Sequence, residues 1–201
     1  MHESIPSPAS AIGDTTSTIA HPPATTRLAI VRHGETDWNR RGLLQGRVDQ
    51  PLNTTGRAQA ADAAESLAGR AWDLVVSSPL DRAATTAGII AERLGLATPA
   101  LAPEFTEQSF GVAEGTPAQA AFTTWPDGDY PEGERRAEVD ARVATGLERI
   151  LAEHHGRSIV LVCHVIVVRS IMLTLTGNEP AEVPNGSATI LTHVEGREGW
   201  S

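Results

Sequence analysis

The sequence has one cysteine, few cations and no long apolar run, and each shortage narrows the class of protein. A single cysteine, Cys163, cannot form an internal disulfide, which is typical of a chain in a reducing cytoplasm. No apolar stretch reaches the roughly 18–20 residues needed to span a bilayer, and no basic segment followed by an apolar one indicates a secretory signal. A formal net charge of −9 disfavours nucleic acid and anionic membranes as partners. We therefore expect a cytoplasmic protein that binds neither.

Composition separates the first 26 residues from the rest. Residues 1–26 are rich in Ser, Thr, Ala and Pro and show no apolar periodicity, so they cannot bury enough surface to offset the entropy of ordering. We expect a disordered N-terminal tail over residues 1–26. Residues 27–201 are long enough for one domain with a substantial buried core.

Hydrophobic periodicity predicts strands that alternate with helices. We expect strands at residues 28–31, 73–77, 97–101, 158–162 and 188–193, and helices at residues 54–67, 79–94 and 138–155. Thr54 or Thr55 is the expected N-cap of the first helix, and Ser78 followed by Pro79 is the expected start of the second. The alternation is typical of an α/β fold, a three-layer α/β/α sandwich with a mostly parallel central sheet.

The segment Arg32-His33-Gly34-Glu35-Thr36 follows the first expected strand. The four residues before it, Leu28-Ala29-Ile30-Val31, are apolar, which is typical of a buried parallel strand. Ligands of open α/β sheets bind just beyond the carboxyl ends of the strands. An imidazole there can attack phosphorus, while a guanidinium holds two phosphoryl oxygens. The alternative is a histidine that only hydrogen-bonds a loop.

Two further strand ends carry the same residue types. Arg82 comes shortly after the second expected strand, and His164 follows the fourth. Because the carboxyl ends of parallel strands meet at one edge of a sheet, two arginines and two histidines would surround one small volume. Unpaired amides at the start of the helix that contains Arg82 would also favour a phosphate.

Several separated motifs occur in order along the chain. They are Arg32-His33-Gly34, Leu44-Gln45-Gly46, Val76-Ser77-Ser78-Pro79-Leu80-Asp81-Arg82-Ala83, Glu107-Gln108-Ser109-Phe110-Gly111 and Val162-Cys163-His164. This set resembles the histidine phosphatase superfamily, which includes the cofactor-dependent phosphoglycerate mutases and many small-molecule phosphatases. The resemblance implies a catalytic domain over residues 27–201 with the same α/β/α fold. It also implies a helix at residues 165–168, where four β-branched residues would by propensity extend the strand.

The resemblance implies a role for each matching residue. His33 would be the nucleophile that becomes phosphorylated, and Arg32, Arg82 and His164 would stabilise charge on the phosphoryl oxygens. Further phosphate contacts are expected from Asn39, Thr36 and Gln45.

Glu107 matches the general acid of the family. As a neutral carboxyl it would protonate the leaving alkoxide, and as a carboxylate it would activate the water that hydrolyses phosphohistidine. That role predicts a pKa raised by burial, whereas a solvated loop carboxylate is the alternative. The resemblance implies no metal ion and no cofactor.

Cys163, Arg169 and Ser170 have the spacing of the cysteine-dependent tyrosine phosphatases. The loop between them would be His-Val-Ile-Val-Val, and a tight amide cradle around phosphate usually needs glycine where the backbone turns sharply. β-Branched residues suit a strand or a buried helix face better. We therefore interpret the spacing as accidental and Cys163 as a small residue that fills space at a strand end.

Three positions depart from the family pattern. Val165 stands where glycine is usual, Ala113 where an aromatic is usual, and Arg135 where a small hydroxyl residue is usual. None of them removes a catalytic residue, so we expect altered substrate preference rather than loss of activity.

Arginines outside the central motifs have plainer expected roles. Arg169 matches an arginine of the family and is expected to form a structural ion pair, with a substrate contact as the alternative. Arg40 and Arg41 lie near the expected mouth of the pocket and are expected to be solvated, with contact to a second anionic group of the substrate as the alternative.

The hypothesis is metal-independent hydrolysis of a small-molecule phosphomonoester through a phosphohistidine at His33. A phosphoglycerate-type mutase is the first alternative, and a catalytically weak protein that binds a phosphate ligand is the second. Only 17 residues separate Gly115 from Gly133, a segment expected to give little cover, whereas a mutase must exclude water from the phosphohistidine. The sequence leaves monomer and homodimer both open.

Overall fold

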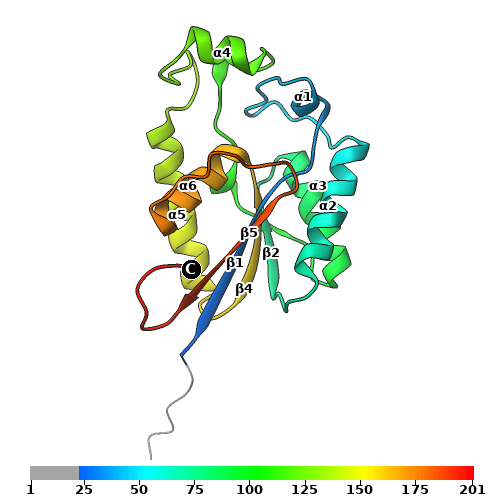
Figure 1. Cartoon of the computed structure of the whole chain (residues 1–201), viewed down its shortest axis with the longest axis vertical. Coiled ribbons are helices and arrows are strands. Elements are labelled where there is room, and N and C mark those ends of the chain that lie inside the picture. Colours follow the sequence, from blue (N-terminus) through cyan, green and yellow to red (C-terminus); the bar gives the residue numbers. More distant parts are fainter. Residues whose placement is uncertain (1–22) are drawn as a thin grey trace, which may run out of the picture.

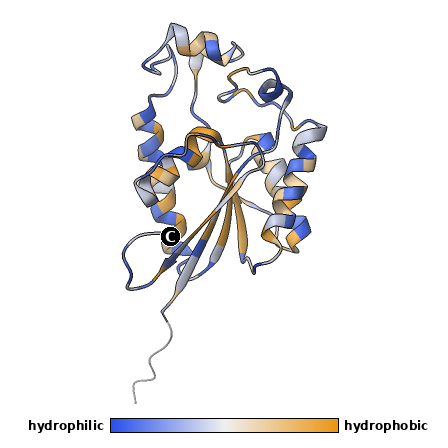
Figure 2. Ribbon diagram, viewed as in Figure 1, coloured by the Kyte–Doolittle hydropathy of each residue, from blue (hydrophilic) through white to orange (hydrophobic). Residues whose placement is uncertain are grey.

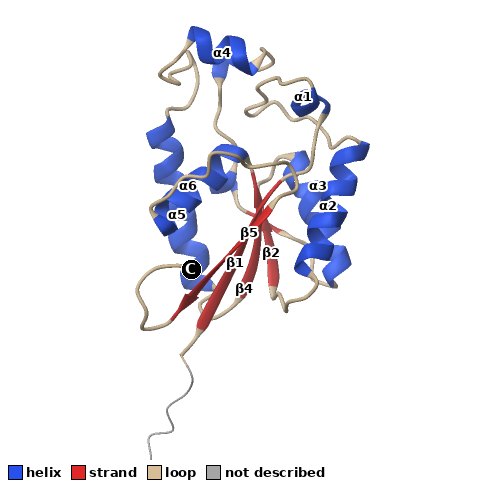
Figure 3. Ribbon diagram, viewed as in Figure 1, coloured by secondary structure: helices blue, strands red, loops and turns tan. Residues whose placement is uncertain are grey.

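The computed structural model describes residues 23–201, which form a five-stranded sheet with helices on both faces (Figures 1 and 3). The strands are β1 (Thr25–Arg32), β2 (Leu74–Ser77), β3 (Ala100–Leu101), β4 (Ser158–Cys163) and β5 (Ala188–Val194). Their order in the sheet is β3-β2-β4-β1-β5. β5 pairs antiparallel with β1, and the other neighbours pair in parallel, which confirms a mostly parallel sheet.

Four long helices complete the three predicted layers. α2 (Thr54–Leu67) and α3 (Asp81–Leu94) cover one face, and α5 (Arg136–Glu153) and α6 (Val165–Thr176) cover the other. Successive residues of β1 enter opposite cores, with Leu28 and Ile30 facing α5 and α6 and with Ala29 and Val31 facing α2 and α3. The middle of this strand, Leu28–Val31, is buried on both faces and therefore has no polar alternation, and its orange colour in Figure 2 reflects this. Each fully buried Leu or Ile stabilises the fold by about 1.5–3 kcal/mol.

Two predicted N-caps are wrong. α3 begins at Asp81 with Leu80 as its N-cap, not at Ser78 and Pro79; the Ser78 hydroxyl bonds to His164 and to the Leu80 amide and caps no amide of the helix itself. α2 begins at Thr54, but its cap is Asn53, whose side-chain oxygen accepts a hydrogen bond from the Gly56 amide at 2.8 Å. Tertiary contacts and a stronger cap thus override the local signals.

Other boundaries shift by a few residues. The strand expected at residues 97–101 is only Ala100–Leu101, and the helix expected at residues 138–155 is Arg136–Glu153. Thr25 and Thr26, assigned to the tail, begin β1, and the Thr26 hydroxyl accepts a hydrogen bond from the Gly156 amide. The prediction of disorder for residues 1–22 lies outside the described residues.

The β-branched run after His164 is helical, as the family resemblance implied. His164 is the N-cap of α6, and Val167, Val168 and Ile171 bury their side chains against the core. The one-sided burial of this helix outweighs the strand propensity of its residues. In residues 23–201, no helix has the length and apolarity that a membrane span requires.

Short elements lie beyond the carboxyl ends of the parallel strands (Figure 1). They are α1 (Asp37–Arg40), α4 (Ala118–Thr124) and two 3-10 turns, Pro103–Phe105 and Gly111–Ala113. None of them was predicted, since each is too short to show a clear periodicity.

Candidate active site

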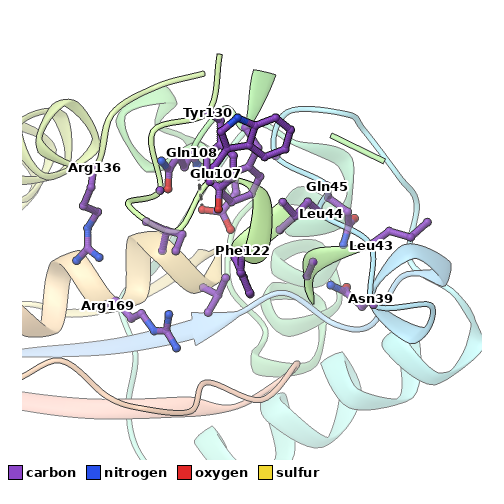
Figure 4. Close-up of a pocket in the computed structure, with 18 of the residues that line it drawn as sticks. Asn39, Leu43, Leu44, Gln45, Glu107, Gln108, Phe122, Tyr130, Arg136 and Arg169 are labelled. Carbon is purple, nitrogen blue, oxygen red and sulfur yellow. Dashed lines mark hydrogen bonds between the residues drawn. The ribbon is translucent and has the colours of Figure 1, made fainter. Parts of the chain in front are cut away.

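A cavity of about 670 Å³ opens beyond the carboxyl ends of β1, β2 and β4 (Figure 4). Residues that follow these strands form its inner end, and residues around α4 form its outer side. Of the predicted site residues, the cavity is lined by Arg32, His33, Asn39, Gln45, Arg82 and Glu107. We call Arg32, His33, Arg82 and the adjacent His164 the polar floor.

His33 is held as a neutral imidazole with one nitrogen free. Its Nδ1 lies 2.7 Å from the carbonyl oxygen of Gly34, which can only accept, so Nδ1 carries the proton and Nε2 has the lone pair. Burial lowers the pKa of His33 well below its ordinary value of 6.5, and the charges of Arg82 and Arg32 lower it further. The result is an unprotonated Nε2, able to attack an electrophile at neutral pH.

Gly34 lets the chain after β1 approach the start of α2 closely. A side chain at Gly34 would collide with the backbone of Gly56, the first-turn residue of α2 that receives the Asn53 cap. The histidine is thereby fixed between the end of β1 and the start of α2.

His164 lies directly beside His33. The two ring centroids are 5.1 Å apart, and His164 is fully buried. Its Nε2 lies 2.8 Å from the Ser78 hydroxyl, while its Nδ1 has no hydrogen-bond partner in residues 23–201. Burial lowers the pKa of His164 well below 6.5, with Arg82 as the next cause, so this ring is neutral too.

The two arginines of the polar floor are fixed by backbone carbonyls. Arg82, only 1% exposed, donates through Nη2 to Gly46 at 2.7 Å and through Nη1 to Val48 at 3.1 Å. Arg32 donates through Nη1 to Val183 at 2.6 Å. The Nε atoms of both arginines are buried without a partner in the described residues. Two positive groups with unused donors suit a bidentate anion such as phosphate.

Glu107 faces this positive site from the segment that follows Phe105. It is 4% exposed, and its Oε1 accepts a hydrogen bond from the Gln108 amide at 2.9 Å. Burial raises the pKa of Glu107, although the Gln108 amide and the charges of Arg82 and Arg32 oppose the change. The predicted raised pKa is confirmed, and Glu107 is not a solvated loop carboxylate.

Asn39 and Thr36 have different places. The Asn39 side-chain oxygen accepts hydrogen bonds from the Thr36 amide, the Thr36 hydroxyl and Asn185, which leaves the Asn39 amide NH₂ for a ligand. Thr36 is fully buried as the N-cap of α1 and does not line the cavity. The structure therefore gives Thr36 a supporting place behind Asn39 instead of the predicted phosphate contact.

Gln45 does line the cavity. It is 6% exposed, and its Oε1 has no partner in the described part of the chain. A buried amide without a partner is costly, so a bound ligand would complete its hydrogen bonding.

Cys163 has neither the position nor the chemistry of a nucleophile. The thiol is fully buried in the apolar core with Leu28 and Ile159 and does not line the cavity. Burial raises its pKa, and the Glu107 charge raises it further, so no thiolate forms near neutral pH. The interpretation of Cys163 as a filler at the end of a strand is confirmed.

The predicted ion pair of Arg169 is wrong. In residues 23–201, Arg169 lies within 4 Å of no carboxylate; it donates to the Ala181 carbonyl at 2.8 Å and lines the cavity (Figure 4). Arg40, by contrast, forms an exposed pair with Asp37, and Arg41 is exposed. Neither Arg40 nor Arg41 lines the cavity.

The three departures from the family pattern affect the cavity unequally. Val165 lines it, whereas Ala113 is fully buried beneath it. Arg135 points to the surface, where it pairs with Glu138 at 2.9 Å, so it does not crowd the site.

The expectation of little cover between Gly115 and Gly133 is wrong. This segment contains α4 and supplies much of the outer cavity lining, including Phe122, Trp125 and Tyr130. The sequence held one signal, since three of the eight aromatic residues fall in these 17 positions. The inner wall also includes Gln108 and Phe110, which the motif contained but to which we assigned no role.

Comparisons with known proteins agree with this geometry. Residues 28–200 match the histidine phosphatase superfamily (branch 1). The uncharacterized phosphatase PhoE of Bacillus subtilis (strain 168) is 36% identical over 155 residues, covering 77% of this chain and 80% of that protein. A probable phosphoglycerate mutase GpmB of Yersinia enterocolitica is 32% identical over 162 residues, covering 75% of each chain.

A solved structure is also similar. The mycobacterial glucosyl-3-phosphoglycerate phosphatase in complex with VO3 aligns with a TM-score of 0.75 at 26% identity, covering 86% of this chain and 99% of the other. Among residues 23–201, no group of three or more His, Cys, Asp or Glu side chains could hold a metal ion. The family match over residues 28–200 and the motif residues gathered around one cavity lead to one conclusion: the chain belongs to the histidine phosphatase superfamily.

Proposed function

We propose that the protein is a phosphatase that hydrolyses small-molecule phosphomonoesters without a metal ion, through a phosphohistidine at His33. The observation that carries this proposal is the neutral His33 ring, whose Nδ1 is bound to Gly34 and whose Nε2 is free in a cavity with two fixed arginines. The phosphatase relatives of the chain support hydrolysis of a phosphate ester as the reaction class.

The first step forms a bond between Nε2 of His33 and phosphorus while the bond from phosphorus to the ester oxygen breaks. Arg32 and Arg82 stabilise the negative charge that the phosphoryl oxygens carry in the transition state. The neutral Glu107 carboxyl gives its proton to the leaving oxygen, so the alcohol departs uncharged. The raised pKa of Glu107 favours this proton donation.

The second step returns the enzyme to its starting state. A water molecule attacks phosphorus, the bond to Nε2 breaks, and the Glu107 carboxylate takes a proton from the water. Inorganic phosphate leaves, and both His33 and Glu107 regain their initial protonation states. No electron transfer or metal ion is needed in either step.

Ser78 positions His164 for this reaction. The Leu80 amide lies 3.4 Å from the Ser78 hydroxyl oxygen and donates to it, so the hydroxyl proton is free to be donated to Nε2 of His164. His164 then carries its own proton on the unpartnered Nδ1. A phosphoryl group on the neighbouring His33 would accept that hydrogen bond.

Hydrolysis is favoured over phosphoglycerate-type mutation by the outer cavity. A mutase must hold a second anionic group, but Arg136 is already paired with Asp140 and Glu179, which leaves Arg169 as the one cavity arginine outside the floor without a carboxylate partner among the described residues. The exposed Asp127 and Asp129 add negative charge on the same side. The mutase remains the second candidate because the relative GpmB is named as one.

The test is turnover of ethyl phosphate and 4-nitrophenyl phosphate in EDTA by the wild type, His33→Ala and Cys163→Ala. We expect His33→Ala to lose at least about 10⁴-fold in kcat, as removal of a nucleophile does, and Cys163→Ala to keep its activity. Acid-labile phosphate on the wild type and its absence from His33→Ala would identify the phosphohistidine. Activity lost in EDTA, or retained in His33→Ala, would overturn the proposal.

The mutase is tested in the same reactions. When 3-phosphoglycerate and 2,3-bisphosphoglycerate are added, a mutase forms 2-phosphoglycerate faster than it releases inorganic phosphate. We expect inorganic phosphate as the product. A wild type that binds phosphate but turns over no ester would instead indicate a binding protein.

A further inference from the structure

The cavity extends well beyond the polar floor. Its volume of about 670 Å³ falls within the range of roughly 300–1,000 Å³ that holds drug-sized ligands, and a phosphoryl group at His33 would fill only the inner end. The outer part is lined mainly by apolar and aromatic side chains. We call Phe110, Phe122, Trp125 and Tyr130 the aromatic wall.

Three of the four rings of the aromatic wall pack against one another. Phe110 and Tyr130 meet edge to face with ring centroids 5.3 Å apart, and Trp125 meets Tyr130 in the same way at 5.8 Å. Phe110 lies three residues after Glu107 in the sequence, and both residues line the cavity, so the wall extends from the segment that carries the expected proton donor. A group attached to the leaving oxygen would therefore reach the wall directly.

Phe122 is the ring of the aromatic wall that the protein leaves partly exposed to solvent. It projects from α4 into the cavity region, yet it is 53% exposed (Figure 4). The other large apolar side chains with high exposure, Leu101, Val112 and Leu173, do not line the cavity. Single exposed apolar residues are common, but one that adjoins an aromatic cluster in a cavity indicates a surface for an apolar ligand.

Charge in the outer cavity does not favour a second anion. Arg136 is neutralised by Asp140 and Glu179, and Asp127 adds a negative charge at the rim. Arg169 is the remaining cation of the lining outside the polar floor, and its charge lowers the pKa of Arg32; in Figure 4 it lies on the same side of the cavity as Arg136, away from Asn39 and Leu43. Arg169 could therefore bind a carboxylate of the substrate. The experiment has to distinguish this possibility from binding of an apolar group by the wall.

We propose that the aromatic wall binds a flat apolar group of the substrate, so that the site prefers phosphate monoesters of aromatic or bulky apolar alcohols to compact esters that carry a carboxylate. This inference rests on the proposed phosphatase function for its biological meaning. The edges and faces of Phe122 and Trp125 would bury such a group, which water solvates poorly.

Binding of non-hydrolysable phosphonates tests the wall without turnover. Affinities for 2-(1-naphthyl)ethylphosphonate, ethylphosphonate and 3-phosphonopropionate are measured by calorimetry, since the three share one phosphonate group and differ only in its substituent. We expect the naphthyl compound to bind at least about tenfold more tightly than either other compound, a gain that burial of an aromatic ring can supply.

Variants assign the preference to the wall. Phe122→Ala and Trp125→Ala should each reduce the ratio of naphthyl to ethyl affinity by about fivefold or more, and Phe122→Leu, which keeps an apolar side chain, should recover part of it. Leu173→Ala removes an apolar side chain outside the cavity that is 43% exposed, and it should keep the wild-type ratio. Circular dichroism would verify that the variants are folded.

Two outcomes would overturn the inference. One is a naphthyl-to-ethyl ratio near one in the wild type, and the other is 3-phosphonopropionate as the tightest ligand, which would assign the outer site to Arg169 and a carboxylate. Failure of the phosphatase proposal gives a different result. In that case no turnover depends on His33, while the three phosphonates still bind in the expected order. Hydrolysis of 2-(1-naphthyl)ethyl phosphate and ethyl phosphate, which share a primary alkoxide leaving group, then extends the comparison to kcat/KM.

Discussion

The polar floor of the cavity is buried and held by backbone carbonyls, whereas the aromatic wall above it includes a half-exposed phenylalanine on a seven-residue helix. The floor comes from the ends of β1 and β4 and the start of α3, whose positions the sheet fixes. The wall comes largely from a segment between the 3-10 turn Gly111–Ala113 and α5 that packs on the site without joining the sheet.

This difference separates the proposed chemistry from substrate selection. Residues on a sheet edge can be held within tenths of an ångström, as phosphoryl transfer requires, because the hydrogen bonds of the sheet resist displacement. A short connecting segment can change its side chains without disturbing that edge. Substitutions in the floor should therefore change rates and pH dependence, and substitutions in the wall should change which ester is preferred.

After removal of the nucleophile His33, the largest effect is expected at Glu107, where floor and wall meet. Glu107→Gln cannot donate a proton, so kcat/KM for ethyl phosphate should fall by about 10²–10⁴-fold. The fall should be much smaller for 4-nitrophenyl phosphate, whose leaving group needs no proton. Since kcat/KM reports the phosphorylation step, slow hydrolysis of phosphohistidine does not obscure the contrast. Equal losses on both esters would contradict the acid role.

The pH profile sharpens the same comparison. The first step needs a protonated Glu107, whose pKa burial raises, so kcat/KM for ethyl phosphate should fall as the pH rises through that pKa. This alkaline limb should be absent in Glu107→Gln. Phe122→Ala should keep the limb while it changes the preference among esters. If Phe122→Ala shifted this alkaline limb to another pH, the aromatic wall would also affect the pKa of Glu107.

Most of the floor was predictable because its signals are local. Four apolar residues before Arg32 and four residues of the same kind before Cys163 identify buried parallel strands, and the order of the parallel strands brings their carboxyl ends together. Helix starts were less predictable. Ser78 followed by Pro79 is a strong local cap signal, but the Ser78 hydroxyl has a better partner in His164, which lies 86 residues away.

The wall was not predictable in the same way. Its seven-residue helix is too short for a periodicity signal, and aromatic residues in a loop do not indicate where their rings point. Arg169 illustrates the same limit. Its expected ion pair required a carboxylate nearby, and only the folded chain reveals a carbonyl of Ala181 there instead. Long-range packing, not local propensity, decides these positions.

An intermediate effect is expected at Ser78. Ser78→Ala leaves His164 free to adopt the wrong tautomer, so kcat should fall by about tenfold, the value of roughly one hydrogen bond at 1.4 kcal/mol. Ser77→Ala is the matched control, because Ser77 is equally buried but donates to the Ser78 carbonyl at 2.9 Å and not to a histidine. Both variants should lose similar stability, and only Ser78→Ala should lose activity.

A double-mutant cycle separates positioning from general packing. In the background of His164→Ala, the further change Ser78→Ala should lower kcat by less than about twofold, because the group it positions is gone. A tenfold loss that persists in that background would mean that Ser78 acts through something other than His164.

The smallest effect is on stability, and it follows from the same burial that keeps the two floor histidines neutral. Burial lowers the pKa of His33 and of His164 well below 6.5 in the folded state, so the unfolded chain binds more protons as the pH falls below about 6.5. Each histidine should then reduce the free energy of unfolding by up to about 1.4 kcal/mol per pH unit, down to its folded pKa. Glu107 acts in the opposite direction, since its raised pKa makes the folded state bind a proton first.

Urea unfolding at pH 7.5, 6.5 and 5.5 measures this slope. In His164→Asn, one of the two histidines that make the free energy of unfolding fall with pH is gone. As the pH falls below 6.5, the free energy of unfolding should therefore decrease more in the wild type than in the variant. Phe122→Ala should keep the wild-type slope, because the wall contains none of the shifted histidines. A slope unchanged in His164→Asn would mean that the His164 pKa is the same in the folded and unfolded states. The floor would then lack the neutral second imidazole on which the proposed positioning by Ser78 depends.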